Sequence, residues 1–167
     1  ADTLTGGTAS DTLSLTSGAG AGNFTNVSGF ETLKTTANVA TGITTVDGNV
    51  ADGGSMTVNA LSLTTAVLTL DGSAELDGSF SITAGGTGDH QITLGQGNDT
   101  YTSTSSAGED VIATAGNNTI TTGDGADIIV GGTGDDNMSG QAGNDTFQFA
   151  SANFSSADTV SGGAGSD

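Results

Sequence analysis

The sequence lacks several residue types, and each absence narrows the range of functions. No cysteine is present, which excludes a disulfide framework and a thiolate metal site. Only one residue is a lysine or arginine (Lys34), whereas 19 residues are aspartate or glutamate, and the formal net charge is -18. Because nucleic acids and anionic membrane surfaces are both bound by basic patches, we expect neither as a partner.

Long apolar runs and an N-terminal signal peptide are also missing. No run approaches the roughly 20 residues of a membrane span, so we expect no direct membrane insertion. Hydrophobic residues make up 33% of the chain, which is little for a globular protein, and proline is absent. An acidic chain of this kind should not collapse alone, and divalent metal ions are the simplest partner that would offset its charge.

What the sequence does contain is a glycine-rich hexad that usually ends in aspartate. Its form is Gly-Gly-x-Gly-x-Asp, and it is clearest in "GGTGDD", "GQAGND" and "GGAGSD". Weaker copies end at Asp99, Asp110 and Asp127, and "GGTASD" ends at Asp11, nine residues after Asp2. His90 and Asn118 stand where two further copies should have aspartate.

The spacing of these aspartates indicates a repeat of nine residues. Asp127, Asp136 and Asp145 follow one another at intervals of nine, as do Asp158 and Asp167. After each hexad comes a triplet whose middle residue is usually apolar, which is the pattern of a minimal strand with one inward side chain. Alternating hexad turns and triplet strands predict an all-β parallel β-roll with two turns and two strands per coil. The apolar middle residues are Ile92, Tyr101, Ile120, Ile129, Met138 and Phe147.

The hexad has the chemistry of a calcium site. Calcium takes six to eight oxygens from carboxylates and backbone carbonyls, and glycine lets a turn aim several carbonyls at one point. One hexad cannot fill this shell, whereas two stacked hexads can. We therefore expect two rows of sites and roughly four to six calcium ions. The first row contains Asp110, Asp127 and Asp145, with His90 or Asp89 at its start, and the second contains Asp99, Asn118, Asp136 and Asp158.

Residues 15–84 follow a different pattern from the repeats at 1–14 and 85–167. Asp-ended hexads disappear, and apolar residues alternate with Thr and Ser, which predicts strands. This segment is either a solenoid stretch without calcium or a small β-sandwich. We interpret Asp47, Asp52, Asp71 and Asp77 as turn residues, and Glu31 with Lys34 as a surface pair. The alternating apolar residues are Val58, Leu61, Leu63, Leu68, Leu70, Leu76, Phe80 and Ile82.

Residues 1–14 and 85–167 resemble the RTX (repeats-in-toxin) nonapeptide proteins of bacteria. The resemblance implies that hexad carboxylates and carbonyls bind calcium, and that the chain is exported by type I secretion to the medium or the cell surface. The segment "NVSGFETLKTT" looks like one found in large bacterial surface proteins, including calcium-dependent S-layer proteins. Carried over by the resemblance, the implied metal ligands are Asp127, Asp136, Asp145, Asp158 and Asp167, with the carbonyls of Gly131, Thr133, Gly140 and Ala142; Asp2, Asp11, Asp99 and Asp110 complete the candidate set.

These observations lead to one functional expectation and two alternatives. We expect a calcium-dependent structural module of a secreted bacterial surface protein, which associates with itself into an S-layer or filament. Both ends cut through the repeat pattern, so we expect a segment of a longer chain. The alternatives are the spacer or stalk of an RTX adhesin, and the RTX secretion tail of an extracellular enzyme or toxin. No nucleophile motif accompanies His90, so we expect no enzyme within these residues.

Overall fold

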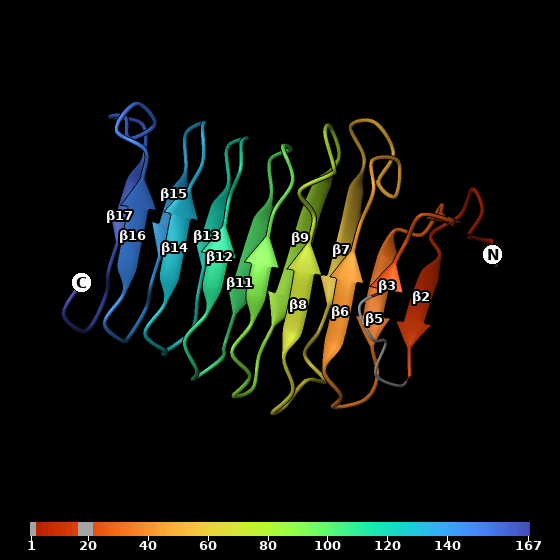
Figure 1. The fold of residues 1–167 in the computed structure, drawn as a ribbon, viewed down its shortest axis with the longest axis horizontal. Helices are drawn as coiled ribbons and strands as arrows, with labels where there is room; N and C mark the ends of the chain where they lie inside the picture. Colours follow the sequence, from red (N-terminus) through yellow and green to blue (C-terminus); the bar gives the residue numbers. More distant parts are fainter. Residues whose placement is uncertain (1–2, 17–21) are drawn as a thin grey trace.

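The computed structural model describes residues 3–16 and 22–167, which form a parallel β-solenoid (Figure 1). Short strands and turns build this part of the chain, and it contains no helix. Consequently, no helix in it is long and apolar enough to span a membrane. The predicted all-β parallel roll is therefore confirmed.

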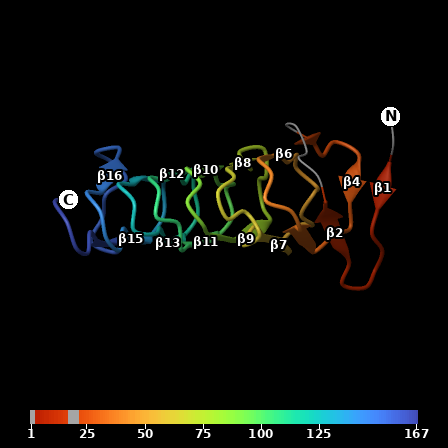
Figure 2. The same ribbon diagram turned by 90° about the horizontal axis from the view of Figure 1, so that it is seen from below.

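Two long parallel sheets form opposite walls of the solenoid, and the turns join them (Figure 2). From the N-terminal end, one sheet contains β3 (Gly22–Asn23), β6 (Thr41–Thr44), β8 (Leu68–Asp71), β10 (Gln91–Thr93), β12 (Asp110–Ile112), β14 (Ile128–Gly131) and β16 (Thr146–Phe149). The other contains β2 (Thr12–Leu15), β5 (Thr32–Thr35), β7 (Ser55–Asn59), β9 (Ser79–Ala84), β11 (Thr100–Ser103), β13 (Thr119–Thr121), β15 (Asn137–Ser139) and β17 (Thr159–Ser161). A separate pair consists of β1 (Leu4–Thr5) and β4 (Val27–Ser28).

From β5 onward, the chain alternates between the two long sheets, so one coil contains two strands and two turns. Each strand pairs in parallel with the strand two positions along in that order, for example β12 with β14 and β13 with β15. The hexad supplies the turn because its glycines reach backbone angles that other residues avoid. The triplet supplies the strand.

The core is a column of side chains between the two sheets. In one sheet Ile92, Val111 and Ile129 occupy equivalent positions in successive coils, and in the other Tyr101, Ile120 and Met138 do so. All six side chains are buried. Burying a side chain of this size stabilises a fold by about 1.5–3 kcal/mol, so each coil adds a similar increment to the stack.

The N-terminal half continues the same solenoid. Strands β5, β7 and β9 precede β11 in one sheet, and β6 and β8 precede β10 in the other. For the described residues between 15 and 84, the solenoid alternative is therefore the one observed, and both sheets pass through residue 84 without a break. Val58, Leu68 and Phe80 are buried as the alternation predicts, whereas Leu61 and Leu76 lie outside the strands and are about half exposed.

Candidate metal centre

Except for Asp167, the last residue of each hexad lies directly before a strand, and these residues form two rows along the solenoid. In the first row, the backbone N–H of Glu109 donates to Oδ1 of Asp127 at 2.8 Å. The N–H of Asp127 donates to Oδ1 of Asp145 at 3.0 Å, and that of Asp145 donates to Oδ1 of Asp167 at 3.0 Å. Each carboxylate therefore binds the backbone of the preceding coil.

The second row repeats this arrangement beside the other sheet. Asp99 donates its N–H to Oδ1 of Asn118 at 2.9 Å, and Asn118 donates to Oδ1 of Asp136 at 2.9 Å. Asp136 in turn donates to Oδ1 of Asp158 at 2.8 Å. The structure thus brings together all four residues that the spacing assigned to this row.

Asp110 does not belong to the first row, which corrects the sequence-based assignment. It is the first residue of β12, pairs with Ile128 of β14, and is exposed. Glu109 occupies the position equivalent to Asp127, and His90, not Asp89, is its counterpart one coil earlier. The reason is register: the residue before the strand faces the turn, and the next residue points outward.

Four row aspartates each keep one oxygen buried without a hydrogen-bond partner among the described residues. These atoms are Oδ2 of Asp99, Asp127, Asp136 and Asp145, and the four side chains are at most 4% exposed. Burying an ionised carboxylate oxygen without a partner is unfavourable by several kcal/mol. Four such atoms in two rows indicate that the turns are built around positive charge.

The pKa values of two of these aspartates reflect the same cost of burying a carboxylate. Burial raises the pKa of Asp99 to about 6, despite backbone N–H donors that lower it. Burial raises the pKa of Asp127 to about 6 as well, although hydrogen bonds from the Thr122 side chain and the Glu109 backbone lower it. The charges of Glu109 and Asp145 add to the effect of burial. In Asp158, by contrast, hydrogen bonds from the backbone of Asp136 and Ser155 lower the pKa.

Glycine at the start of the hexad makes room for the carboxylate at its end. A Cβ on Gly140 would collide with Oδ2 of Asp145, which is one of the bare oxygens, that is, the buried oxygens without a hydrogen-bond partner among the described residues. Gly143, in the same turn, has φ +140°, and a Cβ there would collide with the carbonyl oxygen of Gly125 in the preceding coil. The glycines therefore allow both the close stacking of turns and the placement of the carboxylate.

The predicted carbonyl ligands lie in these turns or at their edges. Thr133 pairs with Ala115, and Ala142 pairs with Ala164, in single parallel bridges between adjacent coils. Gly131 lies further away, at the end of β14, where a Cβ would meet the ring of Phe149.

Asp11 begins a similar arrangement at the N-terminal end. Its Oδ2 is also buried without a partner among the described residues, and its backbone N–H donates to Oε2 of Glu31 at 2.7 Å. Glu31 thus takes the next position of the second row. Asp2 lies outside the described residues.

Three positions in the rows have side chains that are fully hydrogen-bonded. Nδ1 of His90 accepts from the N–H of Leu68 at 3.0 Å, and its Nε2 lies 3.1 Å from the carbonyl oxygen of Gly85. Glu109 accepts from Tyr101, Ser103 and Gly123 at 2.8, 2.7 and 3.2 Å. Nδ2 of Asn118 donates at 3.1 Å each to Ala115, Gly116 and Asp136.

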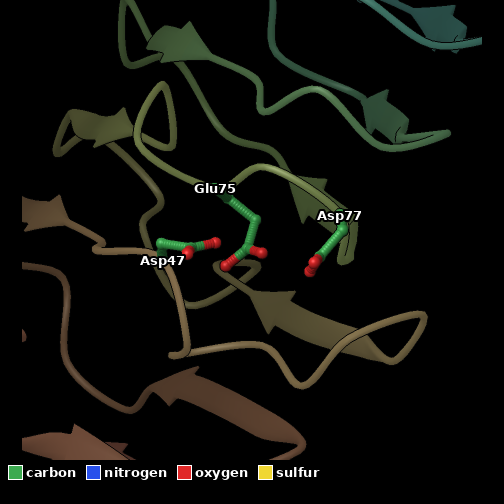
Figure 3. A group of neighbouring side chains, drawn as sticks. All are labelled: Asp47, Glu75 and Asp77. Atoms are coloured by element: carbon green, nitrogen blue, oxygen red, sulfur yellow. The ribbon is translucent and has the colours of Figure 1, made fainter.

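A separate acidic cluster lies outside both rows. The carboxylates of Asp47, Glu75 and Asp77 lie within 4.8 Å of one another (Figure 3). Glu75 is buried, but both its oxygens accept backbone N–H groups, from Gly78 at 3.1 Å and Val50 at 3.4 Å. This cluster therefore lacks the bare buried oxygens that distinguish the row aspartates.

The row geometry fits calcium. Bare carboxylate oxygens and stacked glycine turns supply the hard oxygen ligands that calcium takes in a flexible shell. When bound there, the ion would neutralise carboxylates that the fold buries. Cysteine is absent, and the single histidine has both ring nitrogens engaged, so the donors do not suit zinc.

Comparisons with known proteins agree with this donor set. The family model of the RTX calcium-binding nonapeptide repeat matches in four copies, over residues 1–23, 112–147 and 154–167. Searches of curated proteins and of solved structures give no significant match. The matched segments contain Asp127, Asp136, Asp145 and Asp167, which lie in the two rows. The chain therefore contains RTX calcium-binding nonapeptide repeats in these segments.

Proposed function

We propose that this chain is a calcium-dependent structural module of a secreted bacterial surface protein. The observation that carries the proposal is the set of buried Oδ2 atoms without partners on Asp99, Asp127, Asp136 and Asp145. A fold that buries these charges in two rows is stabilised by the ions that neutralise them. Repeats of this family are typical of secreted extracellular proteins, which supports the proposed location.

The calcium ligands that we propose come mainly from the C-terminal coils. Asp127, Asp145 and Asp167 lie in successive coils of the first row, and Asp136 and Asp158 do so in the second. Carbonyls of the hexads, including those of Thr133, Gly140 and Ala142, complete the shell. Asp99 and Asp11 add two carboxylates with the same bare oxygen.

Calcium binding of this kind couples folding to export. With a net charge of -18, the chain repels itself where calcium is scarce. Outside the cell, any ion that binds only the folded state stabilises it by mass action. A chain that stays unfolded inside and folds outside suits type I secretion.

Self-association is the second part of the proposal. It rests on the surface around β16 and β17, the last strands of the solenoid at its C-terminal end. An apolar hollow lies at this end, lined by Phe147, Phe149, Phe154 and Val160, and Phe154 is 60% exposed. Exposed apolar surface favours contact with another copy, and a head-to-tail contact that does not close builds a filament or lattice.

A spacer in an adhesin is the competing function, because the coils stack along one long axis (Figure 1). We propose no catalytic role for these residues. Both ring nitrogens of His90 are engaged by backbone groups, so the ring is not available as a general base.

Sedimentation velocity tests the proposal. The chain is compared in chelator, in millimolar calcium and in millimolar magnesium as the control. An expanded chain that becomes compact and then forms large, chelator-reversible species supports the surface module. A compact monomer at high concentration supports the spacer, and no calcium-specific change contradicts calcium-dependent folding.

A further inference from the structure

Not every turn of the solenoid has the same chemistry at its last residue. Asp127, Asp136 and Asp145 each bury one oxygen without a partner among the described residues. His90, Glu109 and Asn118 occupy equivalent positions, are equally buried, and have their polar side-chain atoms in hydrogen bonds. Turns whose last residue has an unpartnered buried oxygen require a cation, whereas turns whose last side chain is hydrogen-bonded do not.

Asn118 shows most directly how a side chain replaces the ion. Its Oδ1 accepts the N–H of Asp99, as the aspartate Oδ1 atoms do in their turns. This bond fixes the orientation of the amide, because only the oxygen can accept an N–H. The amide nitrogen is therefore directed at three oxygens: two carbonyls of its own turn and Oδ1 of Asp136 in the next coil.

Those three oxygens are of the types that calcium binds. Ala115 is also the partner of Thr133 in the bridge between the two coils, so its turn is stacked on that of Asp136 in register. With the amide N–H₂ at 3.1 Å from each oxygen, the partial positive charge of the amide takes the place of the ion. The neutral amide also removes one carboxylate from the pair of turns, which lowers the attraction for a divalent cation.

His90 achieves the same result in the first row with different atoms. Its Nδ1 accepts the N–H of Leu68, so the proton of the neutral ring is on Nε2, which donates to the carbonyl of Gly85 in its own hexad. The side chain of Glu109 accepts hydrogen bonds from Tyr101, Ser103 and Gly123. Burial and the charge of Glu109 raise the pKa of Tyr101 far above its usual value, so the phenol stays a donor.

We propose that N–H and O–H donors take the place of a cation at His90, Glu109 and Asn118, so that the hexads 85–90, 104–109 and 113–118 bind no calcium of their own. The identity of the last hexad residue then determines which turns bind an ion. This inference depends on calcium binding by the repeats, but not on self-association. It implies that replacing the amide of Asn118 by a carboxylate creates a site that the protein does not have.

The test counts bound calcium in the 167-residue chain by native mass spectrometry and by equilibrium dialysis. We expect Asn118→Asp to bind one ion more than the wild type. Asn117→Asp is the matched control, because it adds the same charge at the adjacent exposed residue, whose Oδ1 already accepts the N–H of Asp135. We expect it to leave the count unchanged.

An unchanged count in Asn118→Asp, with calcium bound to the wild type, would overturn this inference alone. A wild-type chain that binds no calcium would instead overturn the proposed function. A second measurement needs no variant: wild-type crystals grown with a lanthanide should show anomalous peaks beside Asp127, Asp136 and Asp145. A peak that contacts the carbonyls of Ala115 and Gly116 would also overturn the inference.

Discussion

The carboxylate of Asp145 lies 3.0 Å from the backbone nitrogen of Asp127, its counterpart 18 residues earlier, and uses only one of its two oxygens for this bond. The other oxygen is buried without a partner among the described residues. The same side chain thus fixes the register between two coils and presents negative charge to a cation. One aspartate therefore holds two coils in register through Oδ1 and offers Oδ2 to an ion. Substitutions that change only one of these oxygens can measure the two contributions separately.

Replacing Asp145 by Asn should reduce the stabilisation by calcium. The amide oxygen can still accept the N–H of Asp127, whereas the bare charged oxygen is lost. For an ion present at a hundred times its Kd, losing the site removes about 2.7 kcal/mol from the free energy of unfolding. Thermal unfolding at a series of calcium concentrations measures the effect. Asp135→Asn, an exposed substitution with the same charge change, should lose much less, and equal losses in both variants would contradict the assignment.

The calcium-free protein should become less stable as the pH rises from about 4 to 6. Burial raises the pKa of Asp99 and Asp127 to about 6, above the ordinary value of 3.8 that applies to the unfolded chain. Between these values the folded state binds more protons than the unfolded state, so the free energy of unfolding falls with rising pH. With calcium, the trend should reverse, because protons compete with the ion for the carboxylates.

In calcium-free buffer, where the chain is expanded at neutral pH, the folded fraction measured by circular dichroism at pH 4.5 and pH 7 checks this prediction. With saturating calcium, urea unfolding at the same two pH values checks it. Observing the same direction of change under both conditions would show that these carboxylates are not calcium ligands.

Two neighbouring isoleucines test the core column. Ile129 is fully buried, whereas Ile128 is 41% exposed on the outer face of the same strand. Ile129→Ala should lower the free energy of unfolding by about 2–5 kcal/mol, because the stacked coils cannot close the cavity. Ile128→Ala should change it by no more than about 0.5 kcal/mol. Urea titrations in saturating calcium provide the comparison, and similar losses at both positions would be inconsistent with the buried column.

The stacking of turns can be tested at Gly134. This residue has φ +125°, and a Cβ there would collide with the carbonyl oxygen of Gly116 in the preceding coil. Gly48 has φ +88° but open space around its Cβ position, so Gly48→Ala isolates the backbone strain, about 1–2 kcal/mol. Gly134→Ala should be more destabilising than Gly48→Ala and should also weaken calcium binding. Calorimetric titration and urea unfolding measure the two effects, and equal losses would argue against close stacking.

The sequence predicted the coil because spacing and polarity agree in the C-terminal half. The nine-residue interval fixed the register of Asp127, Asp136 and Asp145, and the single apolar residue of each triplet identified Ile129 as inward-facing. The assignment of Asp110 was wrong because this hexad ends in a glutamate, Glu109, and an aspartate happens to follow it. With Glu109 in the row, the step from Asp99 is ten residues and the step to Asn118 is nine. With Asp110, these steps are eleven and eight, which are further from the nine-residue repeat.

The N-terminal half could not be resolved in the same way, because its coils differ in length and have no constant turn residue. Ser55 of β7 pairs with Ser79 of β9, a separation of 24 residues, whereas Asp127 and Asp145 are 18 apart. The roles of Asn118 and His90 were also out of reach. They depend on which atoms their amide and imidazole groups meet, and spacing alone does not show this.

The row hydrogen bonds have a mechanical consequence. Asp145 binds the backbone of Asp127, and Asp167 binds that of Asp145, so successive coils are linked in series along the axis. A force that pulls on the C-terminal strand therefore acts on one interface between coils at a time, and the stack unwinds coil by coil. If the proposed ions lie between coils, each would strengthen one such interface, and the calcium concentration of the surroundings would set the tension that the module withstands.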